Sequence, residues 1–138
     1  MWLSRQMRSA PPTADADLGV TTIAGDRVGV VTRGEVRALP VYGPGGYIWL
    51  PENGNGVLVI KGGPGGEEQC VSGMRQKEPP EDMEPGELYL YGPGENTVYL
   101  KKDGSIELRG TSLTMVGETV NIEGDLWVNG ERYRPCRC

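Results

Sequence analysis

The sequence predicts an all-β protein with two modules: a small barrel, and a ladder of short strands that closes only when several copies of the chain meet. Its 138 residues include 22 glycines and 11 prolines, which separate short runs of Val, Ile, Leu, Tyr and Trp. That pattern is typical of strands joined by tight turns. No long window has the period of an amphipathic helix. In the last third of the chain, pairs of aliphatic residues recur at short intervals.

Residues 1–17 show neither alternation nor helical period and contain an Ala-Pro-Pro-Thr run. We expect a flexible arm, or a docking arm held on a partner by Trp2, Leu3 and Met7. The segment lacks the apolar core of a signal peptide, and no apolar run approaches the ~18 residues of a membrane span. Neither general secretion nor a transmembrane helix is therefore expected.

Residues 18–74 carry six runs with strand character between glycine-rich turns, at 20–23, 27–32, 35–41, 47–50, 56–61 and 69–74. Such a set fits a small closed barrel of the oligonucleotide/oligosaccharide-binding (OB) shape. The run 57–60 is entirely apolar, so we expect that strand to be covered on both faces. Tyr47 and Trp49 are expected to pack against the next module, with glycan binding as the alternative. Cys70 is expected to be a small buried residue.

Residues 75–85 form a charged connector with three prolines, which marks the boundary between the modules. The formal net charge of the chain is −5, and no segment carries a field of basic residues. We therefore expect no nucleic acid as a partner.

Residues 86–130 repeat one pattern six times: two aliphatic residues two positions apart, then a turn signal such as Asp103-Gly104. Successive side chains on a strand point to opposite faces, so both members of a pair face the same side. The pairs are Leu88/Leu90, Val98/Leu100, Ile106/Leu108, Leu113/Met115, Val120/Ile122 and Leu126/Val128.

Two aliphatic residues per strand are too few to form a core within one chain, and the other face carries charges such as Glu107 and Arg109. We therefore expect a homotrimer, in which three ladders form a triple-stranded β-helix or prism with the aliphatic pairs at its centre. Closure would also pair strand edges between chains. A flat antiparallel meander packed on the barrel is the alternative.

Past the connector the residues resemble a known family. The stretch Glu84-Pro85-Gly86-Glu87-Leu88-Tyr89-Leu90-Tyr91, the ladder, the run 119–125 and the closing Val128-Asn129-Gly130 are similar to the central spike, or baseplate assembly protein V, of Mu-like contractile-tailed phages and related injection systems. The resemblance covers about residues 18–130. It implies a trimer with an N-terminal barrel collar, a C-terminal β-helix and a tip at the centre of the baseplate.

The resemblance further implies a structural protein bound to a baseplate hub protein, which pierces the outer membrane of the target cell when the sheath contracts. The membrane contact would be transient. The protein would reside at the tail tip of a virion or injection particle after synthesis in the bacterial host cytoplasm. A glycan-binding barrel and a non-puncturing tail accessory protein are alternatives.

Residues 131–138 form the expected apex. Spikes of this family often bind iron there through a His-x-His pair, but this chain has no histidine. Cys136 and Cys138 have the same spacing, and a trimer would gather six thiols for a metal ion, for interchain disulfides or as free thiols. Arg134 and Arg137, with Arg132, are candidates to meet anionic lipid head groups, or form a solvated basic end. No other cofactor is expected.

Enzymatic activity is not expected. A chain without histidine has no Ser-His-Asp triad. The acid pairs Glu67-Glu68 and Glu81-Asp82 lie in predicted loops rather than across a cleft. The glycine-rich run 61–66 lacks the closing lysine of a phosphate-binding loop. The sequence thus favours a mechanical role.

Overall fold

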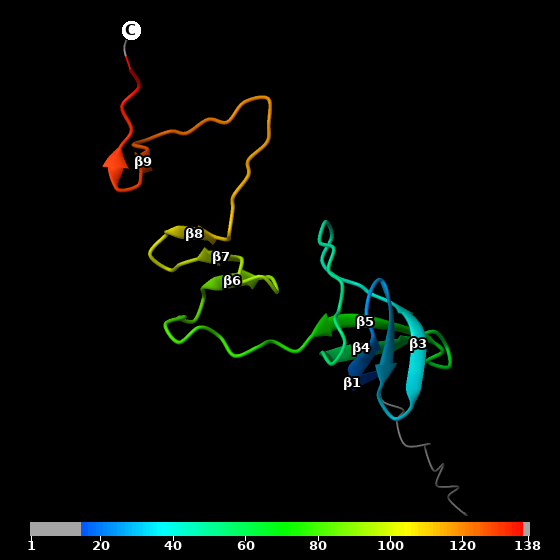
Figure 1. Ribbon diagram of the computed structural model, residues 1–138. Helices are drawn as coiled ribbons and strands as arrows, with labels where there is room; N and C mark the ends of the chain where they lie inside the picture. Colours follow the sequence, from blue (N-terminus) through cyan, green and yellow to red (C-terminus); the bar gives the residue numbers. More distant parts are fainter. Residues whose placement is uncertain (1–14, 137–138) are drawn as a thin grey trace, which may run out of the picture. The chain divides into compact units, whose positions relative to one another are not determined.

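The computed structural model describes residues 15–136, which form strands, turns and loops without a helix (Figure 1). This confirms the all-β expectation. The chain divides into two compact units, Met1–Pro79 and Pro80–Cys138, and the division falls within the charged connector 75–85. In the described part of the chain, no helix is long and apolar enough to cross a membrane.

The first unit is built on one five-stranded antiparallel sheet with the order β3-β2-β1-β4-β5. Just past β3, Val41 forms a parallel bridge with Val71 of β5, and the Tyr42 N–H donates to the Val71 carbonyl oxygen at 2.8 Å. The two outer strands of the sheet are thereby joined. The strands are β1 (Ala16–Ile23), β2 (Arg27–Val31), β3 (Glu35–Pro40), β4 (Gly56–Gly62) and β5 (Glu68–Met74).

One face of this sheet encloses the core of the first unit. Its buried residues come from four of the five strands, because alternate side chains of each strand point inward. At Gly19 of β1 a Cβ would collide with the Val30 side chain and lie 2.9 Å from the Val31 carbonyl oxygen, so only glycine fits there. The core consists of Val28, Val30, Leu39, Val57, Val59 and Val71.

The expectation that residues 57–60 are covered on both faces is wrong within this unit. Val57 and Val59 are buried, but Leu58 and Ile60 on the other face are 39% and 40% exposed. The strand is apolar on both faces, yet the unit has only one layer of sheet and encloses a single face of it. Cys70, opposite Ile60, is likewise half-buried rather than buried.

The prediction of a strand at 47–50 is also wrong, because these residues belong to the connection between β3 and β4. The Val41–Val71 bridge already occupies the edge that such a strand would need. Trp49 packs against the core of its own unit instead, and its indole N–H donates to the Tyr42 carbonyl oxygen at 3.4 Å.

The connection is fixed at its base by Thr21, a buried residue of β1. The Thr21 N–H donates to the Asn55 carbonyl oxygen at 2.9 Å, and the Gly54 N–H donates to the Thr21 carbonyl oxygen at 2.8 Å. The Thr21 hydroxyl accepts from the Asn55 N–H at 2.9 Å and donates to the Glu52 carbonyl oxygen. These bonds satisfy the backbone of a segment that has no strand partner.

The second unit contains a three-stranded antiparallel sheet of β6 (Leu88–Tyr91), β7 (Thr97–Leu100) and β8 (Ile106–Arg109). Further along, β9 (Trp127–Val128) and β10 (Glu131–Arg132) form a hairpin. Its turn is Asn129-Gly130, with φ of 53° and 81°, the backbone that favours an Asn-Gly turn. The boundary expected between the ladder and the apex, after residue 130, therefore falls inside this hairpin.

The strands expected at 112–116 and 119–123 are absent from the structure, which has no ladder pairing between β8 and β9. Of the run expected at 125–129, only Trp127 and Val128 form a strand. A strand needs a neighbour to accept its backbone hydrogen bonds, and residues 112–116 and 119–123 have no such strand beside them among residues 15–136.

Candidate assembly surface

The aliphatic pairs of β6, β7 and β8 lie on one face of their sheet, as the sequence predicts. The pairing register places Leu88 opposite Leu100 and Leu90 opposite Val98. It also places Leu100 opposite Ile106 and Val98 opposite Leu108. Directly opposed residues share a face, so the six side chains form two rows across the three strands.

This aliphatic face is exposed within the chain. Leu88, Leu90, Leu100, Ile106 and Leu108 are 38–66% exposed, and Val98 is half-buried. Six adjoining aliphatic side chains without cover form the kind of patch that marks an interaction surface.

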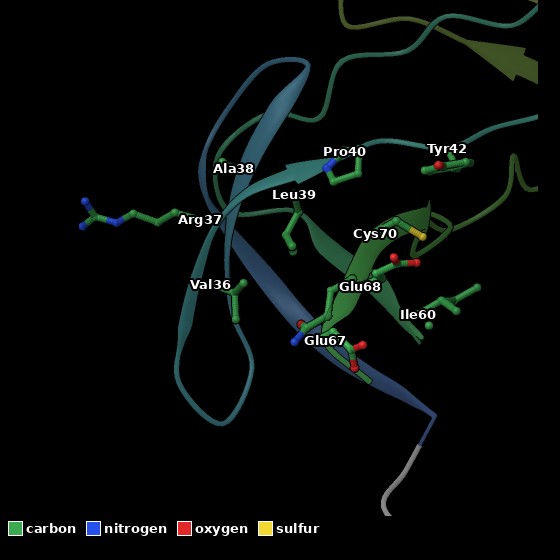
Figure 2. A pocket seen from close by; sticks show the side chains of 12 residues that line it. Val36, Arg37, Ala38, Leu39, Pro40, Tyr42, Ile60, Glu67, Glu68 and Cys70 are labelled. Carbon is green, nitrogen blue, oxygen red and sulfur yellow. The ribbon is translucent and has the colours of Figure 1, made fainter. Parts of the chain in front are cut away.

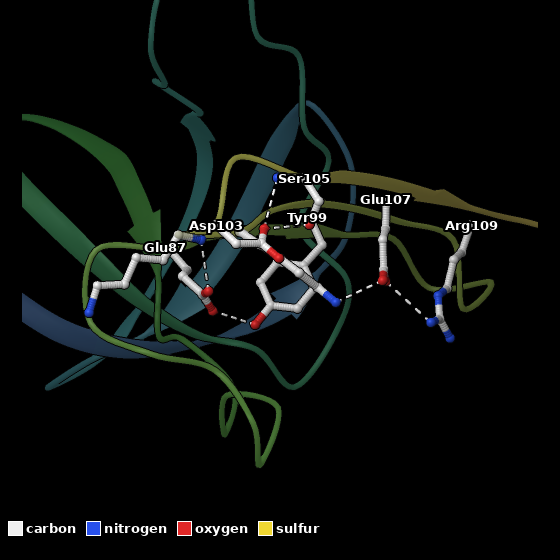
Figure 3. Close-up of polar contacts among 8 residues, drawn as sticks. Glu87, Tyr99, Asp103, Ser105, Glu107 and Arg109 are labelled. Carbon is white, nitrogen blue, oxygen red and sulfur yellow. Dashed lines mark hydrogen bonds and ion pairs between the residues drawn. The ribbon is translucent and has the colours of Figure 1, made fainter. Parts of the chain in front are cut away.

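The opposite face is polar and holds a connected network (Figure 3). The Tyr99 hydroxyl donates to Glu87 at 2.5 Å. Lys101 Nζ lies 2.7 Å from a Glu107 carboxylate oxygen, and Arg109 Nη2 lies 3.2 Å from the other. Lys101 Nζ also lies 5.2 Å from the centre of the Tyr99 ring.

The network shifts the proton affinity of its members. The Lys102 backbone N–H and then the Tyr99 hydroxyl bond the Glu87 carboxylate and lower its pKa. The hydrogen bond that Tyr99 donates to Glu87 raises the pKa of Tyr99 to about 12. The hydrogen bond from Lys101 lowers the pKa of Glu107. These groups hold one another in their ordinary charge states, which indicates a structural network rather than a reactive one.

Tyrosine rings complete the polar face. Tyr89 meets Tyr99 edge to face at 5.3 Å and stacks near Tyr91 at 6.2 Å. Tyr89, Tyr99 and Glu107 are half-buried by these contacts. On the polar face of this sheet the side chains therefore pack against one another, whereas the aliphatic face is exposed and available to a partner.

The aliphatic pattern continues beyond the sheet. Leu113, Met115, Val120, Ile122 and Val128 are exposed, and Leu126 is half-buried. Of these six, Leu113 lines one pocket with Leu90, Val98 and Leu108 of the sheet. Ile122 and Leu126 line another pocket, beside Arg132 and Tyr133. Sequence periodicity predicts all twelve. Those of β6 to β8 have strand partners for their backbone, Val128 pairs with Glu131 in the β9–β10 hairpin, and the Leu126 carbonyl oxygen accepts from the Tyr133 N–H at 2.7 Å.

The predicted apical site is described only in part. Arg134 and Cys136 are exposed and the Cys136 thiol is free, whereas Arg137 and Cys138 lie outside the described residues. Arg132 pairs with Asp125. Among residues 15–136, no group of three His, Cys, Asp or Glu side chains could hold a metal ion.

The first unit has an open groove of about 580 Å³ between β3 and β5 (Figure 2). It mixes apolar residues such as Leu39 and Ile60 with the charged Arg37, Glu67 and Glu68. Trp49 does not line it. The groove offers no paired aromatic platform for a sugar ring, since Trp49 packs on the core and Tyr47 lies exposed on a loop.

No protein-family model matches this chain, and no match was found among curated proteins.

Proposed function

We propose that this chain is the subunit of a trimeric central spike, the tail tip of a contractile phage tail or a related injection device, which punctures the target membrane when the sheath contracts. The observation that carries the proposal is the exposed aliphatic face of the β6–β8 sheet. That face requires cover, and a stiff trimeric rod supplies it by bringing three such faces to one axis.

The unpaired segment between β8 and β9 supports the same assignment. Residues 112–123 keep the alternation of a strand but pair with no other strand among residues 15–136. In a triple-stranded β-helix the neighbour comes from another copy, so both the aliphatic pairs and the backbone groups are satisfied at once. A flat meander packed on the first unit would leave this backbone unpaired.

The first unit would serve as the collar. Its strand order and the parallel bridge between its outer strands support a five-stranded barrel of the OB shape. In this proposal the collar binds the baseplate hub protein, and the rod transmits the force of contraction to the tip. The contact with the outer membrane is transient, and the work comes from the sheath rather than from chemistry on this chain.

The proposal is tested by the solution mass of the purified full-length protein, measured by light scattering with and without reductant and chelator. We expect three times the chain mass of 14.9 kDa under all conditions. A trimer that dissociates with reductant or chelator would assign its stability to Cys136 and Cys138. A folded monomer would refute the spike.

A further inference from the structure

Besides the aliphatic face of the β6–β8 sheet in the second unit, the protein exposes an apolar surface in its first unit, on the connection between β3 and β4. Arg37 and Glu52 enclose 14 residues without a charged side chain, the longest such run in the sequence. The connection extends away from the sheet in Figure 1. In this connection Ile48 is 94% exposed, and Tyr47 and Leu50 are also exposed.

This connection is held in place rather than loose. Trp49 packs on the core, the Tyr47 N–H donates to the Pro44 carbonyl oxygen at 3.1 Å, and Thr21 bonds the base. An apolar tip on an anchored loop loses little conformational entropy on binding, which suits it to insert into a partner surface. We name Tyr47, Ile48 and Leu50, which follow the turn at Pro44, the loop tip; Tyr42 lies at the base of the connection, where its N–H bonds Val71 and its side chain lines the groove of Figure 2.

A third apolar surface lies on the outer face of the sheet, away from the core. The register places Leu18 opposite Leu58, Ala16 opposite Ile60, and Val20 opposite Val31. Leu18 is 82% exposed, and Val20, Val31, Leu58 and Ile60 are exposed as well. These six residues of β1, β2 and β4 form an uncharged patch that we name the outer strip.

We propose that the loop tip of one copy docks on the outer strip of the next copy, so that three first units form a closed ring. This inference rests on the proposed trimer. Around a threefold axis each contact joins two different surfaces, so every copy must offer one surface of each kind. The loop tip and the outer strip are two such surfaces, and a ring of three leaves neither uncovered.

The charges around both surfaces favour a second copy over a lipid surface. Glu35 and Arg37, which flank the outer strip, pair with each other at 3.2 Å, and the loop tip is bounded by Arg37 and Glu52. Neither surface has the excess of basic residues that anionic lipids attract. Two uncharged surfaces meet without burying an unpaired charge.

The test is a disulfide trap in the full-length protein, with Cys70, Cys136 and Cys138 replaced by serine. One chain carries Ile48→Cys and another, with a different affinity tag, carries Leu18→Cys, and the two are co-expressed. Every mixed ring of three contains one junction where the two substituted positions meet. We expect a covalent dimer that contains both tags on a non-reducing gel.

Asn53→Cys is the matched control for Ile48→Cys, because Asn53 is exposed in the same connection but outside the loop tip. The proposal predicts at least about tenfold less covalent dimer with this control, as for the loss of a specific contact. Equal trapping by both variants would overturn it.

Light scattering separates the two proposals. A trimer that does not trap the Ile48 and Leu18 positions overturns the ring contact but leaves the spike, whereas a monomer overturns both. Binding of the purified trimer to neutral or anionic phospholipid vesicles that is lost with Ile48→Glu would identify a membrane as the occupant instead.

Discussion

The clearest perturbation of the proposed rod is Ile106→Asp, in the aliphatic face of β8. In the single chain Ile106 is 66% exposed, so an aspartate there would be solvated. For a monomer the cost would be that of an ordinary surface substitution, within about 0.5 kcal/mol. The two oligomeric states therefore predict very different outcomes for one change.

In a trimer that covers this face the cost is much larger. Full burial of an isoleucine side chain contributes about 1.5–3 kcal/mol, so covering the exposed two-thirds of Ile106 contributes roughly 1–2 kcal/mol per chain. Burial of an unpaired polar group costs about 2–7 kcal/mol more. Three copies together lose at least ~9 kcal/mol of the free energy that favours the trimer. This loss is of the same size as the ~4–15 kcal/mol that association costs in translational and rotational freedom.

The assay is light scattering of the variant, with far-UV circular dichroism to follow the β-structure. We expect loss of the trimer, to monomer or to aggregate. Thr97→Asp is the matched control, because Thr97 lies on the polar face of the same sheet opposite Arg109, and it should remain trimeric. A monodisperse, folded trimer from Ile106→Asp would refute the reasoning.

Two further predictions concern the individual units. Thr21→Val keeps the side-chain shape but removes the hydroxyl that bonds Glu52 and Asn55, so we expect the first unit to lose about 1–3 kcal/mol in urea unfolding; an unchanged midpoint would contradict the role of this hydroxyl. The pKa of Glu87 is lowered in the fold, so its contribution is present above its ordinary pKa of 4.5 and is lost as the pH falls through the lowered value. Thermal midpoints measured from about pH 6 to pH 3 should therefore fall less steeply for Glu87→Gln than for the parent protein, and equal slopes for the two proteins would contradict the role of this carboxylate.

The chain has two kinds of apolar surface with different structural consequences. In the first unit a closed sheet covers one apolar face and leaves the other, at Leu18 and Leu58, exposed. In the second unit the exposed aliphatic face of the β6–β8 sheet has no covering layer. In a single copy the first unit therefore has a closed core, whereas the aliphatic face of β6–β8 stays exposed, which is the arrangement expected if the proposed rod folds only on assembly.

Local pattern was sufficient to predict the β-class, β2 to β5 of the first sheet and the shared face of Leu88, Val98 and Ile106; of β1 it predicted only residues 20–23, because Ala16 and Asp17 were assigned to the arm. Period-two alternation and turn residues depend only on neighbours in sequence, and the pleat converts them directly into a face. The Asn129-Gly130 turn likewise carries the sequence signal of the β9–β10 hairpin, although β10 has no aliphatic pair.

The tertiary structure decided which of these segments find partners. Residues 47–50 read as a strand, but the Val41–Val71 bridge takes the edge they would have joined, and Trp49 turns to the core. The apolar run 57–60 predicted a strand buried on both faces, but only one face of β4 packs in a core. Residues 112–123 alternate like a strand, yet in the described part of the chain no strand pairs with them. Alternation specifies the two faces of a strand, whereas the presence of a layer or an edge beside it depends on chain elements distant in sequence, or on another copy.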